Sequence, residues 1–147
     1  ARTLEACYSG FSAATFVEKA LDDQWEQREL MERMRHLTVC MHHFLPKDYS
    51  KAIGVLREAI PALAGHKFAN LVFPDYVEQY GLEELGISLD ALGLFTQYGS
   101  IEFGIRPFIK QYEAEKMERM CQWARHENFH ITRLASEGCR PIVILFF

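Results

Sequence analysis

Two pairs of charged residues, each spaced by four positions, are the residues of this chain best placed to do chemistry. Glu102 precedes Arg106 and Arg133 precedes Glu137, so each pair is expected on one face of a helix. In the simplest interpretation, each is an exposed ion pair that adds about 0.3–0.5 kcal/mol to helix stability. In a functional interpretation, the carboxylates face a cationic group and the arginines bind phosphates.

The sequence around Glu102 is unfavourable for a regular helix. Pro107 has no N–H to donate to the carbonyl of Phe103, and its ring crowds that turn, so a short or kinked helix is expected. A segment that gives up helix stability beside a carboxylate favours the functional interpretation. Further on, Arg140 follows a helix stop at Gly138, where it faces either the helix dipole or a phosphate.

The segment HENFH at 126–130 matches the zinc-protease motif HExxH letter for letter. That motif needs an unbroken helix so that both imidazoles share one face. Continuing the preceding apolar stripe (Met117, Met120, Cys121, Ala124) would bury Glu127 and Asn128, so Asn128 is expected to cap a new helix instead. His126 and His130 then lie on different elements, and no His, Asp or Glu follows Glu137. We therefore predict that this chain has no metal site.

Apolar residues recur at three- and four-residue steps along most of the chain, which is typical of amphipathic helices. The opening before Ser12 is expected to be weakly structured, and 65–74 to be helix or turn, with a short strand as the alternative. Helix ends are expected at caps and breakers, namely Ser12, Pro46, Asp48 or Ser50, Gly81, Ser88 or Asp90, and Gly99. The buried stripes are expected to include Ala13, Phe16, Val17, Ala20, Leu21, Leu30, Met34, Leu37, Met41, Phe44, Ala52, Val55, Leu56, Ala59, Ile60, Leu63, Ile131, Leu134 and Ala135.

No region alternates at a period of two, so the predicted fold class is all-α. Short turns between the helices favour a HEAT-like stack of antiparallel helical hairpins, an α-solenoid, in a single domain over 1–147. DYSKAIGVLREA at 48–59 also resembles NFHITRLASEG at 128–138, an offset of 80 residues or two periods of 40.

Composition and charge narrow the class of protein. The 147 residues are 49% hydrophobic and 24% charged, as in globular proteins. No apolar run reaches the roughly 18 residues of a membrane span, and no signal peptide opens the chain. The four scattered cysteines (Cys7, Cys40, Cys121, Cys139) form no CxxC pair, which indicates reduced thiols and a cytoplasmic location.

The net charge of −4 does not by itself point to nucleic acid. The charge is uneven, however, because residues 1–98 carry a net −5 and residues 99–141 a net +1. The part with the paired charges is therefore the least acidic part of the chain.

That part of the chain resembles a known family. SIEFGIRPFI at 100–109 followed by NFHITRLASEGCRP at 128–141 is similar to the signature of the HEAT-like-repeat DNA glycosylases for alkylated bases, the AlkC/AlkD superfamily, and most of all to its AlkC branch. The similarity joins two separated motifs over about the last third of the chain. The first two thirds are compatible with it as generic helical hairpins.

The resemblance implies a substrate and a set of roles. The substrate would be double-stranded DNA carrying cationic N3-alkylated purines such as 3-methyladenine, whose glycosidic bond is hydrolysed without a cofactor or a metal. The charged base is already a good leaving group, so catalysis needs carboxylates that stabilise an oxocarbenium-like sugar and a positioned water. The implied residues are Glu102 and Glu137 for catalysis and Arg106, Lys110, Arg133 and Arg140 for DNA binding.

The sequence also departs from the family pattern. A family tryptophan is expected near position 145, where this chain has Leu145 inside PIVILFF, and no later segment supplies the expected aspartate. The chain is therefore expected to be the N-terminal part of a longer repeat domain and a poor glycosylase by itself. The alternative is a helical-repeat scaffold that binds protein without catalysis. The sequence leaves the oligomeric state open.

Overall fold

Every element of regular secondary structure in the described part of the chain is a helix, and turns connect these helices. The structure is a computed structural model that describes residues 1–66, 68–99, 101–111 and 113–138, with only the backbone described at 109–110 and 113–117. No strand occurs in these ranges, which confirms the all-α prediction. The helices are α1 (Arg2–Cys7), α2 (Ala13–Ala20), η1 (Trp25–Gln27), α3 (Leu30–Phe44), α4 (Tyr49–Ala59), η2 (Ile60–Leu63), η3 (Ala69–Leu71), α5 (Val72–Tyr80), α6 (Leu85–Phe95), α7 (Glu102–Gln111), α8 (Glu113–Trp123) and α9 (Phe129–Gly138).

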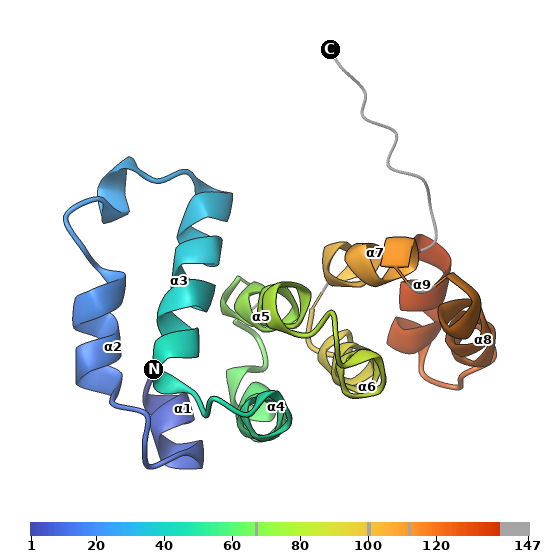
Figure 1. Cartoon of the computed structure of the whole chain (residues 1–147), viewed down its shortest axis with the longest axis horizontal. Helices are drawn as coiled ribbons and strands as arrows, with labels where there is room; N and C mark the ends of the chain where they lie inside the picture. The colour runs from blue at the N-terminus through green and yellow to red at the C-terminus, as the bar shows by residue number, and fades with distance from the viewer. Residues whose placement is uncertain (67, 100, 112, 139–147) are drawn as a thin grey trace.

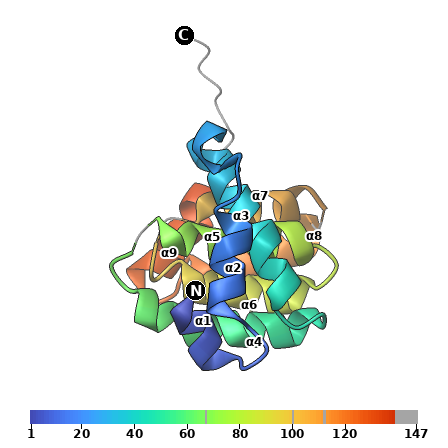
Figure 2. The ribbon, with the colours of Figure 1, turned by 90° about the vertical axis from the view of Figure 1, so that its left-hand side faces the viewer.

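The helices stack in layers, as expected for a HEAT-like repeat. One layer runs α3, α5, α7, α9, each helix packing on the next, and in Figure 1 these helices follow one another from left to right. Helices α4 and α6 pack on each other beneath it, α1 packs on α4, and α8 packs on α7 and α9. Seen from the N-terminal end, the tip formed by η1 and the start of α3 projects beyond the stack (Figure 2).

Local caps explain several helix ends. The Ser12 hydroxyl accepts from the N–H of Thr15 and begins α2, and the Asp48 carboxylate accepts from the N–H of Lys51 at 2.9 Å and begins α4. Helix α3 ends ahead of Pro46, and Gly81 is the C-cap of α5. The predicted boundaries at these positions are confirmed.

Other predicted boundaries are wrong. The opening before Ser12 forms α1, because Leu4 packs into the core. Helix α6 begins after Glu84, so Ser88 is not a cap but lies inside the helix, and Asp90 does as well. The Ser88 hydroxyl is buried and donates to the carbonyl of Gly81 at 2.8 Å, and it also bonds the Tyr49 hydroxyl at 2.7 Å. Ser88 therefore makes tertiary hydrogen bonds inside α6, although the local sequence pattern predicts it as a helix cap.

Two further boundary predictions have different outcomes. Helix α6 ends at Phe95 rather than at Gly99, and a turn connects them. The 65–74 segment contains η3 and the start of α5, so the helix or turn prediction is confirmed and the strand alternative is wrong. Pro74 lies in the first turn of α5, where a missing N–H costs no helical hydrogen bond.

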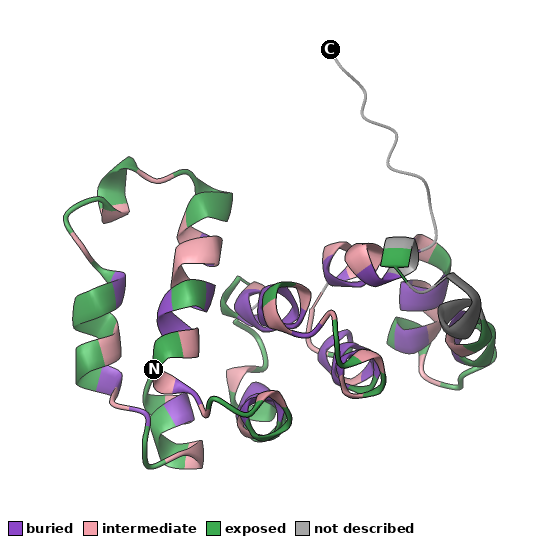
Figure 3. Ribbon diagram, in the orientation of Figure 1, coloured by how far each residue is buried: buried purple, intermediate pink, exposed green. Residues whose placement is uncertain are grey.

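The core lies between the layers, and burial rises toward the middle of the stack (Figure 3). Most of the predicted stripes are buried or half-buried, and Leu56, Leu92 and Ile105 have no exposed surface. The exceptions at the N-terminal end are Val17, Leu21 and Leu30, which are exposed because α2 and the start of α3 form the outer end of the stack. At the end of α8, Met120 is buried as predicted, but Cys121 and Ala124 are exposed. Among the described residues, no helix combines the length and apolarity needed to cross a membrane.

Candidate active site on helices α7 and α9

Helices α7 and α9 lie close together and run in the same direction. Two contacts fix this arrangement: Glu102 at the start of α7 meets Arg133 of α9, and Ile105 further along α7 meets Gly138 at the end of α9. A Cβ atom on Gly138 would lie 2.8 Å from Cγ2 of Ile105, so only glycine permits this approach. The axes of α7 and α9 are therefore fixed by packing where the charged residues emerge.

The central contact of the site is an ion pair between these helices. Nη2 of Arg133 lies 2.8 Å from Oε1 of Glu102, and the two side chains are 26% and 15% exposed. The sequence places Glu102 with Arg106, and Arg133 with Glu137, within single helices, whereas this pair joins α7 to α9. Shielding from water makes such a pair stronger and more directional than an exposed helical pair.

Arg106 and Glu137 each lie one helical turn beyond the pair. Four residues advance a helix by about 6 Å, so both follow the ion pair in the same direction along their parallel helices. Both are half-buried, and Nε of Arg106 is buried with no hydrogen-bond partner among the described residues. Pro107 lies inside α7, which nevertheless continues to Gln111.

The helical phase of α9 agrees with the prediction. Ile131, Leu134 and Ala135 are buried, while Arg133 and Glu137 are half-buried. The α9 side chains predicted to do chemistry therefore face away from the core but remain partly shielded.

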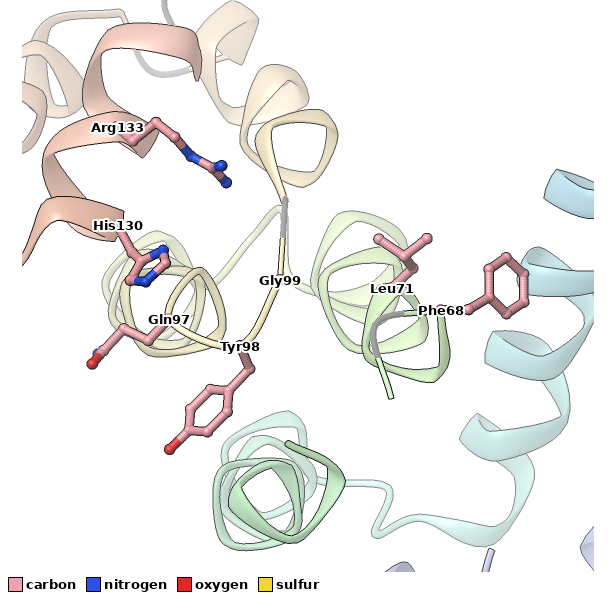
Figure 4. Close-up of a pocket in the computed structure, with 7 residues that line it drawn as sticks. All are labelled: Phe68, Leu71, Gln97, Tyr98, Gly99, His130 and Arg133. Carbon is pink, nitrogen blue, oxygen red and sulfur yellow. The ribbon is translucent and has the colours of Figure 1, made fainter. Parts of the chain in front are cut away.

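An open cleft of about 540 Å³ adjoins Arg133. Figure 4 shows His130 and Arg133 projecting from α9 toward Gly99, with Tyr98 on the turn after α6 and Leu71 ahead of α5. The described residues that line it are Phe68, Leu71, Gln97, Tyr98, Gly99, His130 and Arg133. This set combines aromatic and aliphatic surface with one arginine, one histidine and no carboxylate.

The sequence missed most of the cleft residues, although one signal was present. His130, Arg133 and Glu137 follow one another at steps of three and four along α9, so they share a stripe. Gln97 and Tyr98 lie on a turn, where no helical phase predicts which way a side chain points. The side-chain amide of Asn128 donates to Oε1 of Gln97 at 3.0 Å, which joins the start of α9 to this turn.

The HENFH segment does not form one helix. Helix α8 ends at Trp123 and α9 begins at Phe129, and the Asn128 side chain accepts from the N–H of His130 at 2.9 Å. Nδ1 of His126 accepts from the N–H of Asn128 at 2.9 Å within the turn. The predicted break at Asn128 is confirmed, and the absence of a shared zinc ion stays a prediction.

Several predicted positions lie outside what the structure describes. Arg140 and Leu145 fall in 139–147, and the side chain of Lys110 is not described although its backbone belongs to α7. Their predicted roles therefore remain predictions.

A second charged pair joins α3 to α5 in the same layer. Nη2 of Arg35 lies 2.8 Å from Oδ1 of Asp75 and 3.5 Å from Oε1 of Glu78. The Asp75 carboxylate has no exposed surface, and burial raises the pKa of Glu78 despite the nearby arginine. Among the described residues of this layer, cross-helix pairing of arginine with a shielded carboxylate thus occurs at Asp75 and at Glu102.

Comparison with known proteins finds relatives among both curated proteins and solved structures. No family model matches the chain. The uncharacterized protein YhaZ of Bacillus subtilis (strain 168) is 39% identical over 138 residues, which are 94% of this chain and 38% of YhaZ. The structure of Pseudomonas fluorescens alkylpurine DNA glycosylase AlkC bound to DNA containing an abasic site analog is similar with a TM-score of 0.88 and 33% identity, over 99% of this chain and 40% of AlkC. The chain thus spans about two-fifths of the length of these relatives.

Proposed function

Because the chain belongs to the HEAT-like-repeat AlkC/AlkD superfamily, in its AlkC branch, we propose that it acts in the repair of alkylated DNA. The proposed substrate is double-stranded DNA carrying cationic N3-alkylated purines such as 3-methyladenine, and the proposed reaction is hydrolysis of their glycosidic bond. Such a reaction belongs in the cytoplasm of a bacterial-type cell, where the DNA is.

One observation carries this proposal. The similarity to DNA-bound AlkC extends over 99% of this chain at 33% identity, and so includes α7 and α9. Those helices carry the two motifs, and they hold two carboxylates, Glu102 and Glu137, on neighbouring parallel helices. A shared fold alone would not support an activity, but these side chains supply the charge that the reaction needs.

The proposed chemistry is electrostatic. An N3-alkylated purine is already positively charged, so its departure needs little help from a general acid. Positive charge then develops on the sugar, and fixed carboxylates in a shielded site stabilise it more strongly than water does. Glu102 and Glu137 would act in this way, and a water molecule would complete the hydrolysis. Arg106, Lys110 and Arg140 would bind DNA phosphates.

The test is release of 3-methyladenine from alkylated duplex DNA by the chain under single-turnover conditions. Glu102→Gln and Glu137→Gln should each lower the rate by about 10²-fold, because each removes one fixed charge. Glu58→Gln is a matched control, since Glu58 is exposed on α4. Equal rates for all four proteins would exclude the proposed roles of both glutamates.

A protein-binding scaffold is the second candidate function. Large apolar side chains are exposed at the outer end of the stack, with Leu30 at 59% and Met31 at 56%. Together with the net charge of −4, such a surface suits a protein partner better than DNA. The affinity of the chain for alkylated duplex at about 50 mM and about 500 mM salt tests this candidate. Equal affinities would favour the scaffold, because phosphate contacts weaken as salt increases.

A further inference from the structure

We infer that Arg133 is a positioning residue, which acts on the reaction by holding the Glu102 carboxylate rather than by binding a DNA phosphate. The inference rests on the proposed function of this site. It assigns Arg133 a partner within the protein, whereas the sequence places Arg133 among the DNA contacts.

The first support is the shielding of the pair. Oε1 of Glu102 is buried, and Nη2 of Arg133 lies 2.8 Å from it. A shielded carboxylate keeps its charge only when an opposite charge replaces the lost water. A phosphate that drew Arg133 away would leave Glu102 without that compensation, so the pair is costly to separate.

The second support is the rigidity of the frame that holds the pair. A Cβ atom on Gly104 would lie 3.0 Å from both Cβ and the carbonyl oxygen of Pro74, so α7 contacts α5 closely on one side. Gly138 brings α9 equally close on the other side. Glu102 therefore has a fixed backbone, and Arg133 fixes its side chain as well.

The third support is the direction of Arg133. Its side chain extends from α9 toward the start of α7, across the inner wall of the cleft (Figure 4). It is only 26% exposed, whereas His130, one turn earlier on the same stripe, is exposed. An arginine that binds a phosphate needs free N–H groups on its guanidinium, and Nη2 of Arg133 is directed at Glu102 instead.

This arrangement gives Arg133 a specific task. Stabilisation of a developing positive charge requires a carboxylate that stays in place, since a displacement of about 1 Å costs about 10²-fold in rate. Arg133 holds the Glu102 carboxylate in place without touching the reacting atoms. Loss of Arg133 should therefore lower the rate on bound DNA without changing how tightly DNA binds.

The experiment compares Arg133→Gln, Arg133→Lys, Glu102→Gln and the double variant Glu102→Gln/Arg133→Gln with the unchanged chain. Arg133→Gln should lower the single-turnover rate at saturating DNA by about 10- to 100-fold. The double variant should be no slower than Glu102→Gln, because Arg133 acts through Glu102. Arg133→Lys should recover part of the rate. Arg119→Gln is the matched control, because it breaks an exposed cross-helix pair with Asp90 and should leave the rate unchanged.

Salt titrations and urea unfolding complete the test. The slope of log K against log salt should be the same for Arg133→Gln and the unchanged chain. A slope smaller by about 0.9 with an unchanged rate would overturn the inference, since it marks a lost phosphate contact. Failure of the unchanged chain to excise would count against the proposed function alone. In that case the unfolding equilibrium constants of Arg133→Gln, Glu102→Gln and the double variant decide. If the effect of one substitution on this constant depends about fivefold or more on the presence of the other, the inference is supported; if the two effects are independent, it is overturned.

Discussion

At the scale of single residues, two shielded carboxylates are each paired with an arginine on a neighbouring helix. Asp75 lies opposite Arg35 and Glu102 opposite Arg133, in both cases at 2.8 Å. An uncompensated charge in either position would destabilise the fold by several kcal/mol. These arginines are therefore structural even where one of them also serves the reaction.

Removing Arg35 tests the first of these pairs. Arg35→Met keeps the apolar stem but leaves the fully buried Asp75 without its cation, so we expect a loss of about 3–5 kcal/mol in unfolding free energy. Arg35→Met combined with Asp75→Asn should recover most of that loss. Urea unfolding measures both, with Arg57→Met on exposed α4 as the control. A loss below about 1 kcal/mol would show that Asp75 is compensated in another way.

His42 should make stability depend on pH. Burial against Tyr76 and Tyr80, and then the charge of Lys47 and repulsion from His43, lower the pKa of His42. The unfolded chain then takes up the proton more readily than the folded chain. The stabilisation is thus complete above about pH 6.5 and falls as the pH drops below that value, by at most about 1.4 kcal/mol per pH unit.

The measurement compares urea unfolding of the chain and of His42→Gln from about pH 7.5 to about pH 5.5. As the pH falls, the unfolding free energy of the unchanged chain should decrease relative to that of His42→Gln. A constant difference across this range would show that His42 has the same proton affinity in the folded and unfolded states.

The sequence predicted which α9 residues are buried, but not which residue pairs with Glu102. Helical phase alone gave the buried Ile131 and Leu134 and the half-buried Arg133 and Glu137, because phase follows from spacing within one helix. It did not give the partner of Glu102. A partner on another helix depends on how α7 and α9 pack, and no local spacing contains that information.

At the scale of the elements, glycines set how closely the site helices approach. Glycine costs a helix about 1 kcal/mol relative to alanine, so the close packing at Gly104 and Gly138 must offset that cost. The caps at Ser12, Asp48 and Asn128 were predictable because their hydrogen bonds are local. Ser88 was not, because its hydroxyl bonds to distant groups.

Gly138→Ala tests the packing of α9 on α7. The added methyl group would lie 2.8 Å from Cγ2 of Ile105, so the helices must separate, and we expect a loss of about 1–2 kcal/mol in unfolding free energy. Gly54→Ala on α4 is the matched control, because a Cβ there meets nothing within 4 Å. It should stabilise the chain by about 0.5–1 kcal/mol. Stabilisation by both substitutions would mean that α9 moves at no cost.

At the scale of the whole molecule, the layered stack brings residues far apart in sequence into one site. The sequence predicted that the helices would stack in layers, since repeated amphipathic helices with short turns stack in this way. The cleft was not predictable, because it forms where the segments before α5 and after α6 meet beside α9. The order of helices in a stack follows from sequence, but the shape of its edges does not.

The net charge of the molecule limits how it can bind DNA. With a net charge of −4, the chain repels DNA at long range, so binding relies on a few cations near the site. The proposed phosphate contacts are Arg106, Lys110 and Arg140, and each should contribute about −0.9 to the slope of log K against log salt. We therefore expect a slope of about −3 and a roughly 40-fold loss of affinity between 50 mM and 200 mM salt.

Arg106→Gln separates this account from non-specific attraction. Removing one phosphate contact should make the slope less steep by about 0.9, while Arg57→Gln, which removes the same charge from exposed α4, should leave the slope unchanged. Fluorescence anisotropy with a labelled alkylated duplex measures both across a salt series. If the two substitutions changed the slope equally, the whole acidic molecule would set its DNA affinity through net charge, and the α7 surface would have no special part in binding.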